Sequence, residues 1–506
     1  MVSDTRLTVV DTLALVGVEP RPVRVECAVS GGLPGLRLVG LPDAAVREAG
    51  ERVRAALQRS GFRWPSQRIV VNLAPADLPK GGAGFDLPLA LGILAASGQL
   101  DPDRFDGLVV HGEVGLDGSL RGVPGALAVA VGARRLGVRR LLVPRPGAEV
   151  TATVDGLDVW AADDLAEAAA LVGGTRPARP LPSGATPPAP DPSVHGDLGD
   201  VRGQPVARRA VEVAAAGGHH LLLVGPPGCG KSMLARRLVT VLPDLDHAAQ
   251  LEVASVHGIA GGPRAVPSPR PPVRAPQSGI TAAALVGGAG GAARPGELSL
   301  AHHGVLVLDE LLETPRAVLD ALRQPLEDGR VTIDRARVRV TLPARVQLVA
   351  TTNPCPCGLL GHPRRTCTCR PDRLATYRAR LSGPLMDRID VHVLLRPVSR
   401  ARLTGPPDGE ASDRVASRVR AARERACARQ GPVLNRDVAR AAVDATTTAA
   451  ARRLLAEGLE ALGASARAHD RCLRVARTVA DLADADVVTG DHVAEALALR
   501  LTGLPA

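Results

Sequence analysis

Aromatic residues are scarce in this sequence, which has two Trp, one Tyr and three Phe among 506 residues. The cores must therefore be built from Val, Leu and Ala, and stacking on nucleobases cannot be the main way in which the protein holds a ligand. Apolar runs are short as well, because every stretch of about eighteen residues contains a charge or a proline. The first residues, MVSDTRLTVVD, lack the basic start and the apolar run of a signal peptide. These absences predict a cytoplasmic protein without membrane spans.

Lysine is almost absent, since Lys80 and Lys231 are the two lysines among 62 basic residues. A chain that uses Arg nearly everywhere else but keeps Lys at two positions indicates places that need a compact ammonium in place of a planar guanidinium. The net charge of +10 suits a polyanionic partner such as nucleic acid, although a basic composition alone is weak evidence.

Composition divides the chain into three blocks, a number that its length also predicts at roughly 150 residues per domain. Residues 174–197 are rich in Pro with little to bury, so we expect a linker between a first block, 1–173, and a second, 198–398. A weaker break near 396–411 precedes a third block, 405–506. The first block alternates short apolar runs with helical stretches, the second repeats strand and helix as parallel sheets do, and the third has helical spacing throughout. We expect a multidomain α/β protein with a C-terminal helical bundle.

A phosphate-binding loop is the strongest motif. Residues 225–232 read GPPGCGKS between an apolar strand and a helix, the context that this motif requires. Its glycines let backbone N–H groups curl around a phosphate, Lys231 reaches the terminal phosphates, and Ser232 can ligate Mg²⁺. A Gly-rich turn before a helix is the alternative, which the strand, Lys, Ser and helix together disfavour. The predicted nucleotide-binding residues are Gly225, Pro226, Pro227, Gly228, Cys229, Gly230, Lys231 and Ser232.

Two acidic residues end a second apolar strand, VLVLDE. Asp309 would hold Mg²⁺ with its water shell and Glu310 would polarise the attacking water, a division that needs adjacent acids at the carboxyl end of a strand. Such a strand end is commonly structural, but together with the phosphate loop it predicts an ATPase. Asn353, which ends the strand VQLVATTN, could orient the lytic water. Arg388, in SGPLMDRID, is a candidate finger on a neighbour's ATP, with an ordinary surface arginine as the alternative.

The sequence resembles the magnesium-chelatase-like AAA+ ATPases of the YifB/ComM type over nearly its whole length. The resemblance rests on GDVRGQPVARRAVEVAAAGGHHLLLVGPPGCGKS, RPGELSLAHHGVLVLDE, ALRQPLEDGRVTI, NPCPCG and LSGPLMDRID. It implies a Lon-protease-like N-terminal domain, an AAA+ core and a helical lid, which match the three blocks. It also implies ATP and Mg²⁺ as cofactors, a homo-oligomeric ring and action on branched or single-stranded DNA. One departure is visible, because Gln277 and Ser278 follow RPPVRAP where family members usually carry paired histidines.

The same resemblance implies a sensor arginine in the lid. The segment SARAHDRCLR carries it as Arg467, which would report the γ-phosphate of the nucleotide, with Arg471 and Arg474 as neighbouring alternatives.

The first block resembles Lon-type proteases, in which a Ser lies a few residues after a Pro-Lys and a later Lys activates it. Here Gly84 stands where that Ser would be, and residues 112–130 have no Lys. A Ser–Lys dyad needs a hydroxyl and an amine, so we expect a catalytically silent domain that contacts a protein partner or assists assembly. Lys80 would then serve local structure or a partner contact. An active ATP-dependent protease is the alternative that the missing Ser and Lys disfavour.

Four of the eight cysteines lie in residues 353–369, as two C-x-C pairs. A cytoplasmic setting and the tight spacing disfavour disulfides, whereas four thiolates on a Gly- and Pro-containing loop can close a tetrahedral Zn²⁺ site. Four unrelated core residues are the alternative, and His362 could replace one ligand. Residues 364–380, with six Arg and one Asp, are a candidate surface for phosphate backbones. The predicted Zn²⁺ ligands are Cys355, Cys357, Cys367 and Cys369; Cys27, Cys229, Cys427 and Cys472 are isolated.

Residues 329–349 contain two β-rich runs around DRAR, which predict a hairpin before Asn353. In the AAA+ branch that the chain resembles, this hairpin points into the ring's channel, where Arg335 and Arg337 would meet DNA phosphates; a solvated turn is the alternative. The sequence thus predicts an ATP-hydrolysing motor, a DNA helicase or branch-migration factor. A protein-remodelling or chelatase-like ATPase acting with a partner protein is the second hypothesis, although nothing in the chain resembles a porphyrin site.

Overall fold

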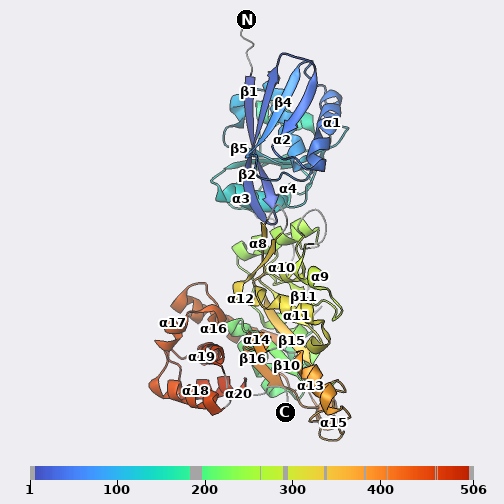
Figure 1. Cartoon of the computed structure of the whole chain (residues 1–506). Coiled ribbons are helices and arrows are strands. Elements are labelled where there is room, and N and C mark those ends of the chain that lie inside the picture. Colours follow the sequence, from blue (N-terminus) through green and yellow to red (C-terminus); the bar gives the residue numbers. More distant parts are fainter. Residues whose placement is uncertain are drawn as a thin grey trace. The chain divides into compact units, whose positions relative to one another are not determined.

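The computed structural model describes residues 6–182, 196–262, 264–288, 294–334, 339–380, 383–406, 408–461, 463 and 465–500. Its contacts divide the chain into two units (Figure 1). The first unit comprises 1–188, 246–268 and 334–341, and the second comprises 189–245, 269–333 and 342–506. The expectation of a multidomain α/β protein is confirmed. The boundaries between the three sequence blocks, including the one between core and lid inside the second unit, stay predictions.

The first unit is built on a seven-stranded sheet of order β3-β4-β2-β1-β5-β8-β9. β2 runs antiparallel to β1 and to β4, whereas the other neighbours are parallel. The strands are β1 (Arg6–Val16), β2 (Glu19–Ser30), β3 (Gly35–Val39), β4 (Arg68–Ala74), β5 (Leu108–Val110), β8 (Arg140–Pro144) and β9 (Asp158–Ala162), with β6 (Glu113–Val114) and β7 (Leu120–Arg121) as a separate small pair.

Six α-helices accompany this sheet among the described residues. α1 begins where the Asp43 carboxylate accepts the Val46 N–H at 2.9 Å, and its buried residues recur every three or four positions, the spacing of one helical face. α2 is buried along its whole length, as its uniformly apolar sequence requires. The helices are α1 (Ala44–Arg59), α2 (Asp86–Ala96), α3 (Ala126–Arg135), α4 (Ala148–Thr151), α5 (Leu165–Gly173) and α8 (His247–Ala260), the last packed on α3.

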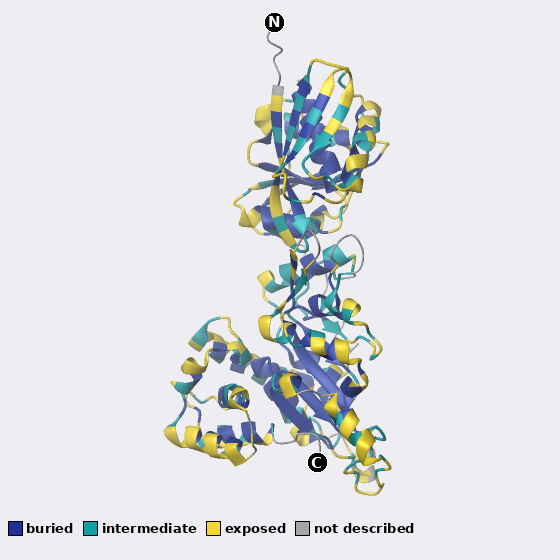
Figure 2. Cartoon of the chain, in the orientation of Figure 1, coloured by how far each residue is buried: buried dark blue, intermediate teal, exposed yellow. Residues whose placement is uncertain are grey.

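The second unit contains a five-stranded parallel sheet of order β11-β12-β15-β10-β16. Its central strands are wholly buried (Figure 2), and two of them, β10 and β12, accordingly read as continuous apolar runs. β10 comes first in sequence but lies between β15 and β16, so the order reverses beside it, and ligands bind at such switch points. The strands are β10 (Leu221–Val224), β11 (Val273–Arg274), β12 (Val305–Leu308), β15 (Gln347–Thr352) and β16 (Val391–Leu394).

Short helices accompany this sheet, and a hairpin precedes β15 in the sequence. The hairpin predicted over 329–349 is present as the two-stranded sheet of β13 (Arg330–Asp334) and β14 (Arg339–Pro343), but Arg335 and Arg337 lie outside the described residues. The helices are α6 (Pro205–Gly217), α7 (Lys231–Arg237), α9 (Ala282–Val286), α10 (Glu297–Leu300), α11 (Arg316–Leu322), α12 (Pro325–Asp328), α13 (Pro371–Ala379), α14 (Gly383–Met386) and α15 (Arg400–Thr404).

The C-terminal part of the second unit is helical, as predicted. One apolar cluster runs from the sheet through α6 into α16 and α19, and it is made mainly of Val, Leu and Ala. Across the described part of the chain, every helix is too short or too polar to cross a bilayer. The C-terminal helices are α16 (Ser412–Gln430), α17 (Arg440–Asp444), α18 (Ala449–Ala461), α19 (Ala466–Leu482) and α20 (Gly490–Ala498).

Candidate nucleotide site and cysteine cluster

The predicted phosphate loop joins β10 to α7 at the switch point of the sheet. Gly228 and Gly230 have φ of 76° and 95°, a left-handed backbone that favours glycine. Gly225 is needed for space, because a Cβ there would lie 2.8 Å from the Leu395 carbonyl oxygen. The loop therefore has the tight curvature that presents backbone N–H groups toward an anion at the start of α7.

Lys231 bridges the loop to the end of β15, the strand that pairs with β10. Its Nζ donates to the carbonyl oxygens of Gly225 at 2.8 Å and Pro226 at 2.9 Å, and to Asn353 Oδ1 at 3.1 Å. Burial lowers the pKa of Lys231, while its neighbours, including the carboxylates of Asp309 and Glu310, act in the opposite direction. The structure thus brings together the predicted phosphate-binding lysine and the predicted sensor asparagine.

Asp309 lies beside Ser232, as a shared Mg²⁺ site requires. Ser232 Oγ donates to both carboxylate oxygens of Asp309, at 3.0 and 2.8 Å, and the Thr351 hydroxyl donates to the same carboxylate. Thr351 also accepts the Glu310 N–H at 3.2 Å. Sequence reasoning missed Thr351; a hydroxyl near the carboxyl end of a buried strand was the signal for it.

Glu310 is exposed and has a φ of 53°, which is uncommon for a residue with a side chain. It lines a pocket of about 410 Å³ together with Ser232, Asp309, Arg236 and the segment 275–279. Gln277 and Ser278, which stand where the resemblance implies paired histidines, are on this wall. Arg236 was not predicted, although it follows Ser232 by four residues and so lies on the same face of α7.

Arg388 is engaged within its own chain. Its guanidinium pairs with Glu327 and donates to the Pro384 carbonyl at 2.7 Å, and 13% of the side chain is exposed. Neither of these partners is among the predicted nucleotide-binding residues. Within one chain, the described structure therefore does not bring Arg388 to the phosphate loop, and the prediction that it acts on a neighbour's ATP stays a prediction.

The three arginines predicted as sensor candidates differ in what they contact. Arg474 donates to the Val438 carbonyl at 2.9 Å, and Arg471 donates to Asp390 Oδ1 at 2.6 Å and to the Arg388 carbonyl at 3.0 Å. Arg467 is exposed in the first turn of α19 and makes no side-chain hydrogen bond or ion pair with other described residues. Of the three, Arg467 is therefore the one whose guanidinium is available to a ligand.

Asp390 is a buried anchor that sequence reasoning missed. Burial by itself would raise its pKa, but the adjoining His219 ring and the Arg471 charge hold the pKa of this carboxyl well below its ordinary value. Its other oxygen, Oδ2, accepts the His220 N–H at 2.9 Å. Asp390 thus stays ionised and ties α19 to the segment that carries Arg388.

The four predicted zinc ligands form one cluster. Their sulfur atoms all lie within 4.8 Å of one another, with Cys355 3.4 Å from Cys357 and both 3.6 Å from Cys367. Sulfurs that share a tetrahedral Zn²⁺ at ~2.3 Å lie about 3.8 Å apart, whereas a disulfide needs ~2.05 Å. The donor set therefore fits a closed Zn²⁺ site and does not fit disulfides.

Backbone groups support these sulfurs. The Leu360 N–H donates to Cys355 Sγ at 3.3 Å and the Cys357 N–H donates to Cys369 Sγ at 3.4 Å, which favours thiolates as metal ligands. His362 is not part of the cluster, because its Nδ1 accepts the Arg364 N–H. Of the isolated cysteines, Cys27, Cys229 and Cys472 are buried and Cys427 is exposed on α16.

In the first unit, the position of Gly84 has no room for a side chain. A Cβ there would lie 2.2 Å from His111 Cε1 and 2.5 Å from His111 Nε2. Burial lowers the pKa of His111 to about 4, so the ring is neutral at pH 7. Lys80 is fully buried, burial lowers its pKa, and its Nζ donates to the Pro75 carbonyl. A neutral imidazole therefore fills the space next to the position at which a Lon-type nucleophile was sought.

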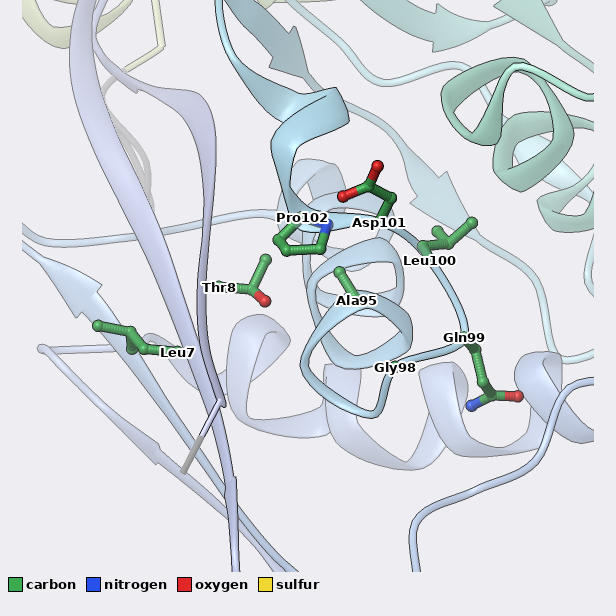
Figure 3. Close-up of a pocket in the computed structure, with 8 residues that line it drawn as sticks. All are labelled: Leu7, Thr8, Ala95, Gly98, Gln99, Leu100, Asp101 and Pro102. Carbon is green, nitrogen blue, oxygen red and sulfur yellow. The ribbon is translucent and has the colours of Figure 1, made fainter. Parts of the chain in front are cut away.

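The first unit also has a pocket of about 540 Å³ beside the end of α2 and the start of β1 (Figure 3). Gln99 on its rim is already hydrogen-bonded to the Arg63 backbone and to Ser97. Neither Lys80 nor Gly84 lines it. This pocket is therefore separate from the place of the predicted protease residues.

Comparisons with known proteins match nearly the whole chain. Family profiles for subunit ChlI of Mg-chelatase, magnesium chelatase subunit ChlI, and the ChlI C-terminal part match residues 25–146, 197–403 and 409–500. The uncharacterized protein YifB of Escherichia coli K12 is 42% identical over 505 residues, which cover 98% of this chain and 97% of YifB. The chain belongs to the YifB/ComM-type magnesium-chelatase-like family.

Two further relatives have similar coverage. Competence protein ComM of Haemophilus influenzae Rd is 41% identical over 508 residues, covering 98% of this chain and 97% of ComM. YifB of Salmonella typhimurium LT2 is 40% identical over 501 residues, with 98% and 97% coverage. The family is one of AAA+ ATPases, so the predicted ATPase class and its requirement for ATP and Mg²⁺ follow from membership.

Proposed function

We propose that this AAA+ ATPase is a ring-forming motor that uses ATP to move branched or single-stranded DNA, as a helicase or branch-migration factor. The ATP-driven part of this proposal rests on one observation: Lys231, Ser232, Asp309 and Asn353 converge at the carboxyl ends of β10, β12 and β15. The DNA part is supported by the net charge of +10 and by similarity to a protein named for competence.

The residues around the loop fit Mg²⁺ and a nucleotide, because a buried ammonium, a hydroxyl and a carboxylate adjoin glycines whose backbone can approach an anion closely. Bound ATP would supply the phosphoryl group, and Mg²⁺ would neutralise the negative charge of the phosphates. Lys231 would exchange its carbonyl partners for phosphate oxygens, while Ser232 and Asp309 hold the ion. Glu310 would polarise the attacking water and Asn353 would orient it.

Two arginines would complete the site. Arg388 would act from a neighbouring subunit, which requires it to leave Glu327, and Arg467 would report the γ-phosphate from the lid. Arg335 and Arg337, which lie between β13 and β14 in the sequence, would contact DNA phosphates. Each of these roles needs a homo-oligomeric ring or a bound ligand.

The cysteine cluster would hold one structural Zn²⁺, whose four bonds close the loop between Asn353 and α13. Residues 1–173 are proposed as a Lon-protease-like domain without protease activity, used for contact with a protein partner. The buried His111 ring beside Gly84 supports this proposal. We expect no ATP-dependent cleavage of casein, and cleavage that a serine-reactive probe blocks would contradict the proposal.

A protein-remodelling or chelatase-like ATPase is the second candidate, favoured by the magnesium chelatase profiles. The two are separated by measuring ATP turnover with single-stranded DNA, a four-way junction or no DNA, and by following junction movement. Stimulation by DNA and ATP-driven junction movement are expected. A protein that neither binds DNA nor responds to it would favour the second candidate.

A further inference from the structure

Four exposed arginines gather on and next to the cysteine loop without acidic partners. We call Arg364, Arg365, Arg370 and Arg373 the arginine cluster. None of these guanidiniums makes a hydrogen bond or an ion pair with any other residue that the structure describes. In contrast, Arg380 in the same segment pairs with Glu313, and Arg418 on α16 pairs with two glutamates. The cluster is therefore a local excess of positive charge.

The cluster borders a pocket of about 650 Å³. Arg370, Arg373 and Arg380 line this pocket together with Cys357 and Cys369, so two ligands of the cysteine cluster form part of its wall. Arg364 and Arg365 lie in the loop between the two cysteine pairs. Two acidic residues, Asp372 and Glu313, also line the pocket. Glu313 lies 3.8 Å from Arg380. The positive charges remain in excess.

We propose that the arginine cluster binds the phosphate backbone of single-stranded DNA. The inference rests on the proposed function and names a contact surface other than the hairpin. Guanidinium groups match phosphate oxygens with paired donors, and a cluster of them without carboxylate partners is suited to a polyanion.

The surface recognises the backbone and not the bases. Tyr377 is the aromatic residue of this pocket, but it is buried and its hydroxyl donates to the Asn353 carbonyl at 3.4 Å. Base stacking needs an accessible ring, so affinity must come from charge. Binding at this surface is therefore insensitive to sequence and strongly weakened by salt.

The same segment touches both strand ends of the candidate nucleotide site. Tyr377 on α13 contacts the backbone of Asn353, and Arg380 donates to the Leu312 carbonyl at 2.9 Å, two residues after Glu310. Arg373 lies on the same helix, α13. DNA bound to Arg373 would therefore act through α13 on the residues that would orient and polarise the attacking water. The arginine cluster thus links DNA binding to ATP turnover.

The test replaces Arg370 and Arg373 together by Ala in the full chain. The matched control replaces Arg420 and Arg453 by Ala; both are exposed, lie on lid helices and have no ion pair in the described structure. Binding of fluorescein-labelled oligothymidylate is measured by anisotropy at several salt concentrations. We expect the salt slope of log Kd to fall by about 0.7 for each lost phosphate contact, roughly 1.4 for the pair. DNA-stimulated ATP turnover should fall in parallel, and the control pair should change neither.

Replacement of the same two residues by Lys should keep most of the salt slope, because the charge remains. An unchanged slope in the Ala pair would overturn this inference while leaving the proposed function in place. Failure of the unmutated protein to bind the oligonucleotide would overturn this inference, and failure to bind a four-way junction as well would also overturn the proposed function. If the Ala pair binds DNA normally but loses oligomer mass in light scattering, the cluster contacts a second copy and the inference is wrong.

Discussion

Gly358 of the cysteine loop packs directly against Pro227 of the phosphate loop. A Cβ at position 358 would lie 2.5 Å from Pro227 Cδ and 2.8 Å from its Cγ. Gly358 also has a φ of 74°, so it satisfies a conformational and a spatial requirement together. The cysteine loop therefore supports the segment that would surround the nucleotide phosphates.

Replacing Gly358 with Ala should weaken ATP binding several-fold, because the new methyl group must displace the ring of Pro227. Gly361 provides a matched control, since it lies in the same loop with a φ of 73° but has nothing within 4 Å of an added Cβ. In both variants, backbone strain should lower the free energy of unfolding by about 1–2 kcal/mol. Titration of a fluorescent ATP analogue should separate them; equal Kd values would show that the contact with Pro227 does not shape the site.

Substitutions of Lys231 and Glu310 should impair different steps, ATP binding and ATP hydrolysis. Replacement of Lys231 with Ala removes the ammonium that contacts phosphates and should abolish tight ATP binding. Replacement of Glu310 with Gln should leave binding intact and slow hydrolysis by at least about a hundredfold, because it removes a general base. Nucleotide binding and single-turnover hydrolysis measure the two effects. Equal turnover in the Gln variant and the unmutated protein would remove Glu310 from its role.

The purified protein should contain about one Zn²⁺ per chain. Replacing Cys355 and Cys357 together with Ser should release the ion and lower the unfolding temperature, because a closed thiolate site contributes folding free energy directly. Replacing Cys427 with Ser is the control, since this cysteine is exposed and lies outside the cluster. Elemental analysis of protein prepared without chelator checks the metal content, and an absence of zinc there would show that the four cysteines pack together without a metal.

Arg471 should matter for stability in a pH-dependent way. Its partner Asp390 is 2% exposed, and removing one member of a buried pair costs about 3 kcal/mol because a charge is left uncompensated. The folded-state pKa of Asp390 is held well below the unfolded value of about 3.9, so the pair stabilises above that pH and its contribution is lost as pH falls through the folded-state pKa.

Replacement of Arg471 with Ala should therefore destabilise the protein most near pH 7 and least in acid. Replacement of Arg474 with Ala is the control, because that guanidinium donates to a backbone carbonyl and has no carboxylate partner in the described structure. Urea unfolding at several pH values measures the difference. A destabilisation that does not change between pH 7 and pH 3 would show that the Asp390 charge is not what Arg471 compensates.

Local patterns were sufficient for much of the nucleotide site. GPPGCGKS and VLVLDE each join a buried apolar strand to chemistry that needs the carboxyl end of a strand, so Lys231, Ser232, Asp309 and Asn353 could be predicted to converge. The hairpin of β13 and β14 was predictable for the same reason, because alternation and turn residues act over a few positions.

The amino-acid sequence by itself determined the strands, the loops and the residue types at their ends, because these depend on neighbours in the chain. Tertiary structure alone decided the contacts between distant segments, which have no local signature: His111 beside Gly84, Arg471 on Asp390, and Gly358 against Pro227. It also decided which arginines are available. Arg388 and Arg471 are held by carboxylates far away in sequence, whereas Arg467 and the arginine cluster are exposed without such partners among the described residues, because a guanidinium pairs only where folding brings an acid within reach.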